Sequence, residues 1–268
     1  MNLLQSLLYG LISGLSELMP VSSAAHQAFL RELFGVPKDP VMDMLIHISV
    51  LVSLYFGARN LIDTFQREQR LLARRTGGSA SRGHLFRFVR TAGLAIAALF
   101  LVFTYAGSKS YSFLSISLFC LINGVLVFLP SRMVQSNKDA RHMTAFDSIL
   151  FGTFGALSAF CGFSRVGMAT SYAVARGADR QHAINWALLI SVPALALMAV
   201  TDFIGIFTAP PAITFVTIIG YLFAIAAAFV GGYYSINIMK FLAVKAGFSA
   251  FAYYSWGMAL FSFVLYLI

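Results

Sequence analysis

Long apolar stretches recur along the chain with few polar interruptions. Six of them approach the roughly 20 residues that a helix needs to cross a bilayer, near residues 41–58, 88–106, 112–130, 183–202, 212–230 and 250–268. Segments of this length span lipid as helices, because a helix satisfies its own backbone hydrogen bonds. The pattern predicts an all-α, polytopic membrane protein with about six full transmembrane helices. The alternative is a soluble helical bundle with an unusually large core.

Two further stretches, 1–30 and 146–175, are apolar but broken about halfway by Gly, Pro and Ser. We interpret each as a re-entrant helical hairpin, in which two half-length helices meet at a bend. The tetrapeptide GLSE at 14–17 resembles GFSR at 162–165, and three spans follow each copy. An odd number of crossings between the copies predicts an inverted-topology repeat, with repeat one near 1–130 and repeat two near 146–268. Broken segments at matching places in two halves indicate a site near the membrane midplane.

Composition agrees with one integral membrane domain over residues 1–268. The chain is 59% hydrophobic and 11% charged, about half the charged fraction of a soluble domain. The opening stretch MNLLQSLLYGLIS lacks the positive charges that begin a signal peptide, so we expect it to be retained.

The net charge of +9 lies mostly in segments that alternation through the spans places on one side. The segment 59–90 is predicted to be a cytoplasmic basic loop, and other basic residues follow the third span or precede the fourth and last. This agrees with the positive-inside rule and argues against a nucleic-acid partner. The basic residues concerned are Arg59, Arg67, Arg70, Arg74, Arg75, Arg82, Arg87, Arg90, Arg132, Lys138, Arg141, Arg176, Arg180, Lys240 and Lys245.

The two broken segments also carry rare intramembrane charges, Glu17 in the first and Arg165 in the second. An ionisable residue inside the membrane indicates function by default, with a partner of opposite charge. We therefore predict that Glu17 and Arg165 meet. The alternative is a buried ion pair that only joins the two hairpins.

The stretch SGLSELMPVSSAAHQ, residues 13–27, gathers further polar groups around Glu17. Pro20 suits the first turn of a helix, which would place Ser22 and Ser23 beside free backbone N–H groups that bind phosphate. His26 follows these serines by four and three residues and should share their helical face. With the Arg165 fork and Ser164, the set is an anion cradle with a nucleophile, an imidazole and a carboxylate. The alternative is a capped helix with a satisfied histidine.

A carboxylate beside a phosphate repels it unless a cation bridges them, so we expect Mg²⁺ or Ca²⁺ at Glu17. Asp43 and His47 lie four apart on the first full span. They are expected to support the site, or to form a simple buried pair.

The motif GLSELMPVSSAAH resembles the first signature of the undecaprenyl-diphosphate phosphatases, or bacitracin-resistance proteins. CGFSRVGMAT at 161–170 is similar to the second, and MDMLIHISVLVSLYF to the span that follows the first. The resemblance covers essentially the whole chain. It implies a bacterial cytoplasmic-membrane enzyme with two re-entrant hairpins and a site open to the outer face. Such an enzyme removes the terminal phosphate of a C55 polyprenyl diphosphate with a divalent cation, recycling the lipid carrier of cell-wall synthesis.

Carried over by position, the resemblance implies catalytic roles for Glu17, Ser23, His26 and Arg165. It also implies that Glu17 is the metal ligand. Ser23 is the expected nucleophile with His26 as its base, and His26 as nucleophile stays open. Substrate and phosphate contacts fall on Ser22, Ser164, Gly162 and Gly167. The resemblance also leaves a homodimer open.

Several positions depart from the signatures. Ser13 replaces the first glutamate, Ala24 a common hydroxyl residue, Cys161 a proline and Val166 a serine, while Met168 and Ala169 replace a small residue followed by threonine. Losing one carboxylate weakens a metal site. Because Glu17, His26 and Arg165 are kept, we expect a divergent member that retains phosphate chemistry. The alternatives are a lipid-carrier flippase, because inverted repeats with broken helices are also typical of transporters, and a non-catalytic polyprenyl-phosphate-binding relative.

Overall fold

The computed structural model describes the chain except residues 74–82, 107–110, 135 and 246–247. Six long apolar helices in the described part confirm the six predicted spans. All the regular secondary structure of the described residues is helical, which confirms the all-α prediction. The six are α3 (Pro40–Gly57), α5 (His84–Ala106), α6 (Phe113–Arg132), α9 (Arg180–Thr208), α10 (Phe215–Lys245) and α11 (Ser249–Leu267).

Both interrupted segments break where the sequence predicts. The first forms α1 (Leu3–Glu17) and α2 (Ser23–Phe34), and the second α7 (Ala145–Ala156), a 3₁₀ turn (Leu157–Ala159) and α8 (Arg165–Ala175). With a rise of about 1.5 Å per residue, each of these four helices is about 23 Å long or less, too short to cross about 30 Å of hydrocarbon. Such short helices are compatible with hairpins that enter and leave at one membrane surface, and this re-entrant arrangement stays our interpretation.

Side-chain caps set the starts of the short helices. Ser22 accepts the Ala25 N–H at the start of α2, and Ser164 accepts the Gly167 N–H at the start of α8. The prediction that Pro20 opens the first turn of α2 is wrong. Pro20 lies in the turn before α2. The helix begins after Ser22, because the Ser22 side chain caps the free N–H groups of the first turn of α2.

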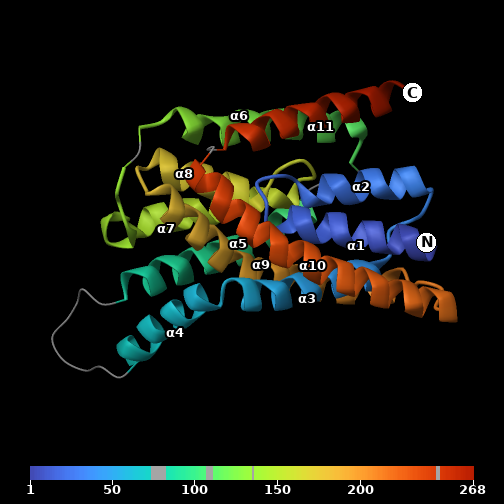
Figure 1. Cartoon of the computed structure of the whole chain (residues 1–268), viewed down its shortest axis with the longest axis horizontal. Helices are drawn as coiled ribbons and strands as arrows, with labels where there is room; N and C mark the ends of the chain where they lie inside the picture. The colour runs from blue at the N-terminus through green and yellow to red at the C-terminus, as the bar shows by residue number, and fades with distance from the viewer. Residues whose placement is uncertain (74–82, 107–110, 135, 246–247) are drawn as a thin grey trace.

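The two hairpins enter the bundle from opposite ends, and their bends meet in the middle (Figure 1). α1 packs on α10 and α7 packs on α5, while α3 meets α9 and α6 meets α11. Exchanging the two halves of the chain reproduces this set of partners. This is the packing that two related halves would have, and the inverted repeat remains our interpretation of it.

Glycines at the α1–α10 and α7–α5 contacts match each other in the same way. A Cβ on Gly14 of α1 would lie 2.3 Å from the Ala228 carbonyl oxygen of α10. A Cβ on Gly152 of α7 would lie 2.3 Å from the Ala92 carbonyl oxygen of α5. Small residues permit such backbone approach, which drives helix association in lipid.

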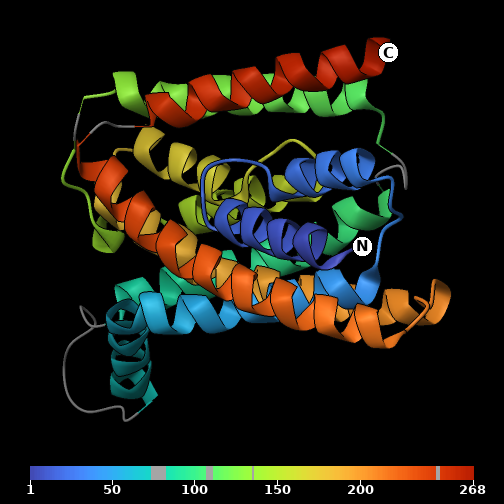
Figure 2. The ribbon, with the colours of Figure 1, turned by 45° about the vertical axis from the view of Figure 1, so that its right-hand side comes forward.

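α6 and α11 run side by side along one edge of the bundle in both views (Figures 1 and 2). Trp256 of α11 donates its indole N–H to the Leu121 carbonyl of α6 at 3.3 Å, and Ser262 donates to the Phe113 carbonyl at 2.6 Å. This pair carries Asn123 and Tyr254 to the hairpin bends.

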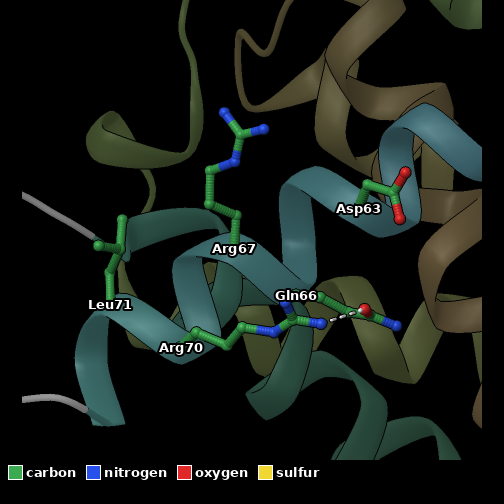
Figure 3. Close-up of a pocket in the computed structure, with 5 residues that line it drawn as sticks. All are labelled: Asp63, Gln66, Arg67, Arg70 and Leu71. Carbon is green, nitrogen blue, oxygen red and sulfur yellow. Dashed lines mark hydrogen bonds between the residues drawn. The ribbon is translucent and has the colours of Figure 1, made fainter.

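The segment 59–90, predicted to be a loop, contains an additional helix, α4 (Arg59–Ala73). Its apolar side packs inward, with the Phe65 and Phe86 ring centroids 5.2 Å apart. Arg67 and Arg70 are exposed, and Arg70 bonds Gln66 at 3.3 Å (Figure 3). The high charge of the segment concealed this amphipathic helix, while Arg74, Arg75 and Arg82 fall outside the described residues.

Candidate active site

Glu17 and Arg165 meet where the two hairpin bends touch, which confirms the predicted pair. Arg165 Nη2 lies 2.9 Å from Glu17 Oε2 and 3.2 Å from the Glu17 carbonyl oxygen. Its Nε donates to Ser191 Oγ of α9 at 3.1 Å. The exposed fractions of the two side chains are 3% for Arg165 and 1% for Glu17. A guanidinium and a carboxylate from distant parts of the chain are thus held together inside the protein.

The predicted phosphate-binding residues lie at the same junction, where they join the two bends. The Gly162 N–H donates to Ser22 Oγ at 3.0 Å, and Ser164 Oγ donates to the Met19 carbonyl at 2.9 Å. Gly162 has φ +127°, a conformation that L side chains rarely adopt. Gly167 faces Pro20, and a Cβ there would lie 3.0 Å from that ring. These contacts give the four residues a positioning role, and phosphate binding by them stays a prediction.

Asn123 fixes the bends from α6. Its Oδ1 accepts the Ser164 N–H at 2.9 Å, and its Nδ2 donates to Ser255 Oγ at 3.0 Å and to the Pro20 carbonyl at 3.4 Å. A buried amide with all these partners orders the start of α8, and so the position of Arg165.

His26 and Ser23 lie at the start of α2, but no hydrogen bond joins them. His26 Nδ1 contacts the Ser22 carbonyl oxygen at 2.5 Å, and Nε2 contacts the Tyr254 hydroxyl at 2.6 Å. The two rings stack with centroids 5.6 Å apart. Both imidazole nitrogens thus contact a backbone or tyrosine oxygen, and the role of His26 as base for Ser23 stays a prediction.

His47 and Asp202 extend the site beyond what the sequence predicted. His47 Nδ1 lies 2.8 Å from Asp202 Oδ2 of α9, and His47 Nε2 lies 3.6 Å from Glu17 Oε1. The alternative of an Asp43–His47 pair is wrong, since Asp43 accepts the Tyr9 hydroxyl at 2.7 Å. Asp202 ends a predicted span, and its intramembrane charge was the signal that could have found it.

A cavity of about 580 Å³ opens next to this cluster, between α2, α3, α5, α6, α9 and the second bend. One part is polar, with Arg31, Lys38, Asp43, His47 and Asp202, and the rest is apolar. A polar compartment continuous with an apolar one suits an amphiphile. The apolar lining includes Phe100, Tyr111, Phe113, Ile116 and Met198.

Two other hollows lack such convergence. One of about 360 Å³ lies on α4 alone, lined by Asp63, Gln66, Arg67, Arg70 and Leu71 (Figure 3). Another of about 640 Å³ is almost wholly apolar, and its wall is formed by α3, α4, α5 and α9. Neither brings together residues from the two broken segments.

The donor atoms near Glu17 decide whether a divalent cation fits. In the described part of the chain, no three His, Cys, Asp or Glu side chains are grouped to hold a metal by themselves. Glu17 Oε1, however, is buried and has no hydrogen-bond partner. An anionic oxygen left free in this way can serve a cation whose other ligands come from substrate phosphate.

Comparison with known proteins identifies the family. The family described as "Bacitracin resistance protein BacA" matches residues 6–261. The chain belongs to this family. It is 27% identical over 259 residues to an undecaprenyl-diphosphatase of Carboxydothermus hydrogenoformans, covering 96% of this chain and 94% of the relative. A protein of the same name from Alkaliphilus metalliredigens is 26% identical over 269 residues, covering 96% of each chain. The family resemblance read from the two signatures is thereby confirmed.

Proposed function

We propose that this BacA-family protein hydrolyses undecaprenyl diphosphate to the monophosphate and inorganic phosphate, which recycles the lipid carrier of the cell wall. One observation carries the assignment: the two signatures meet as a buried Glu17–Arg165 pair beside an amphiphilic cavity. The headgroup would occupy the polar part of that cavity, and the isoprenoid tail would leave along its apolar wall toward lipid.

In this proposal Arg165 binds the terminal phosphate, because its planar fork matches phosphate oxygens. Phosphoryl transfer depends mainly on positioning and on neutralising oxygen charge. Ser23, the first residue of α2, is the proposed nucleophile, and His26 remains the alternative. The His26–Tyr254 contact at 2.6 Å holds the imidazole at the start of α2, where it would move a proton.

A divalent cation, Mg²⁺ or Ca²⁺, is part of the proposal, with Glu17 Oε1 as its carboxylate ligand. When bound, it would neutralise charge on the diphosphate. Glu17 itself would orient the headgroup against Arg165.

The cavity is proposed to open to the outer face of the cytoplasmic membrane. Val36 and Lys38 of its lining belong to the α2–α3 connection, at the end of the bundle opposite α4, and Glu32 lies in the last turn of α2 (Figure 1). The α4 end carries most of the basic residues and would be cytoplasmic by the positive-inside rule.

Phosphate release from purified protein tests the function, using C55 and short-chain diphosphates with and without chelator. Glu17→Gln, His26→Ala and Arg165→Ala are each expected to lower turnover by about 100-fold or more, as loss of a charge-stabilising group does. Arg70→Ala on the exposed face of α4 is the matched control and should retain full turnover. Lipid translocation without phosphate release, or normal turnover by Arg165→Ala, would refute the assignment.

A further inference from the structure

Two buried atoms of the site face each other without hydrogen-bond partners. They are Glu17 Oε1 and His47 Nε2, and the distance between them is 3.6 Å. That distance is too long for a hydrogen bond. Coordination bonds of about 2.1 Å to each atom would span it, so the pair is spaced as two ligands of one cation.

The far side of the imidazole prepares Nε2 for this role. Nδ1 lies 2.8 Å from Asp202 Oδ2, and a neutral imidazole that donates its hydrogen to this carboxylate carries its lone pair on Nε2. Lys38 Nζ contacts the other carboxylate oxygen of Asp202 at 3.2 Å and helps to hold it. Metal-ligating histidines almost always donate their second ring N–H to a carboxylate or carbonyl in this manner.

Ser13 lies one turn before Glu17 on the same face of α1, and its hydroxyl is also buried without a hydrogen-bond partner. It is a neutral oxygen, so Glu17 is the anionic ligand that α1 offers a cation from this face.

We propose that His47 is a nitrogen ligand of the divalent cation at Glu17 and that Asp202 is its positioning residue. This proposal rests on the proposed function. An imidazole ligand favours ions such as Fe²⁺, Ni²⁺ or Zn²⁺ over Ca²⁺ and Mg²⁺, and Mn²⁺ serves below as a spectroscopic probe of the same site. With so few protein ligands, the cation binds tightly only when diphosphate oxygens complete its coordination.

Pulsed electron paramagnetic resonance of Mn²⁺ tests the ligand directly, on the full chain in detergent with methylenediphosphonate as the diphosphate probe. The wild type should show ¹⁴N modulation from one imidazole. His47→Gln should abolish the modulation, whereas the control His182→Gln, at the other end of the bundle, should retain it. A wild-type spectrum without nitrogen coupling, or coupling that persists in His47→Gln, would overturn the proposal.

Asp202→Asn tests the positioning role, and it should weaken Mn²⁺ binding by about 10- to 100-fold. An unchanged Mn²⁺ affinity in a folded Asp202→Asn variant would count against that role. The wild-type spectrum decides the ligand even where a variant fails to fold. Phosphate release from the same samples separates the two claims. Hydrolysis without nitrogen coupling removes His47 as ligand and keeps the enzyme, whereas coupling without hydrolysis removes the enzyme and keeps the cation site.

Discussion

Replacing Arg165 by Met removes the guanidinium while keeping much of the side-chain volume. The change leaves Glu17 Oε2 without its 2.9 Å partner and the Glu17 carbonyl without its 3.2 Å partner. Both side chains of the pair are almost fully buried. Breaking a buried ion pair from one side costs about 3–5 kcal/mol, because an uncompensated charge remains inside. We expect Arg165→Met to lower the free energy of unfolding by that amount.

The double variant Glu17→Met/Arg165→Met isolates the pair. Replacing both partners by apolar groups is often neutral or stabilising, so it should recover most of the lost stability while turnover stays abolished. Thermal unfolding in detergent, followed by fluorescence of the buried Trp186, measures the stability of the single and the double variant, and phosphate release measures their turnover. The single variant should unfold on the order of 10 °C below the wild type.

Ser191→Ala is the matched control, because it removes only one hydrogen bond of Arg165, worth about 1 kcal/mol. A double variant as unstable as the sum of its single variants would refute the reasoning. Such additivity would mean that the two charges do not interact in the folded protein.

Three further substitutions test the surroundings of the site. Gly14→Leu should abolish folding, measured as loss of the monodisperse peak in gel filtration, because even a Cβ would lie 2.3 Å from the Ala228 carbonyl; an intact peak would contradict the close packing. Tyr254→Phe should lower kcat about 10-fold, as expected for a positioned proton-transfer group, since His26 loses its 2.6 Å partner; unchanged steady-state kinetics would exclude that contact from catalysis. Asn123→Leu should destabilise the protein by about 2 kcal/mol or more, because it leaves buried backbone groups unpaired at the bends. Denaturant unfolding measures this cost, and an unchanged midpoint would argue against it.

Periodicity and rare charges predicted much of the fold and part of the site. The spans follow from runs of apolar residues, and the two bends follow from helix-breaking residues in the middle of short apolar segments. The partnership of Glu17 and Arg165 could be predicted across 148 residues, because a charge inside a membrane needs a counter-charge. α4 was missed, since its amphipathic pattern is hidden among many arginines.

The sequence by itself determined which residues are buried in lipid or protein, because the cost of exposing a polar backbone to hydrocarbon is local and can be read along the chain. Only the tertiary structure decided which buried polar groups meet. His47 bonds Asp202 of α9 rather than Asp43 of its own helix, and His26 bonds Tyr254 of α11 rather than Ser23. Hydrogen bonds reach only about 3 Å, so their partners depend on how the helices pack, which spacing along one helix does not record.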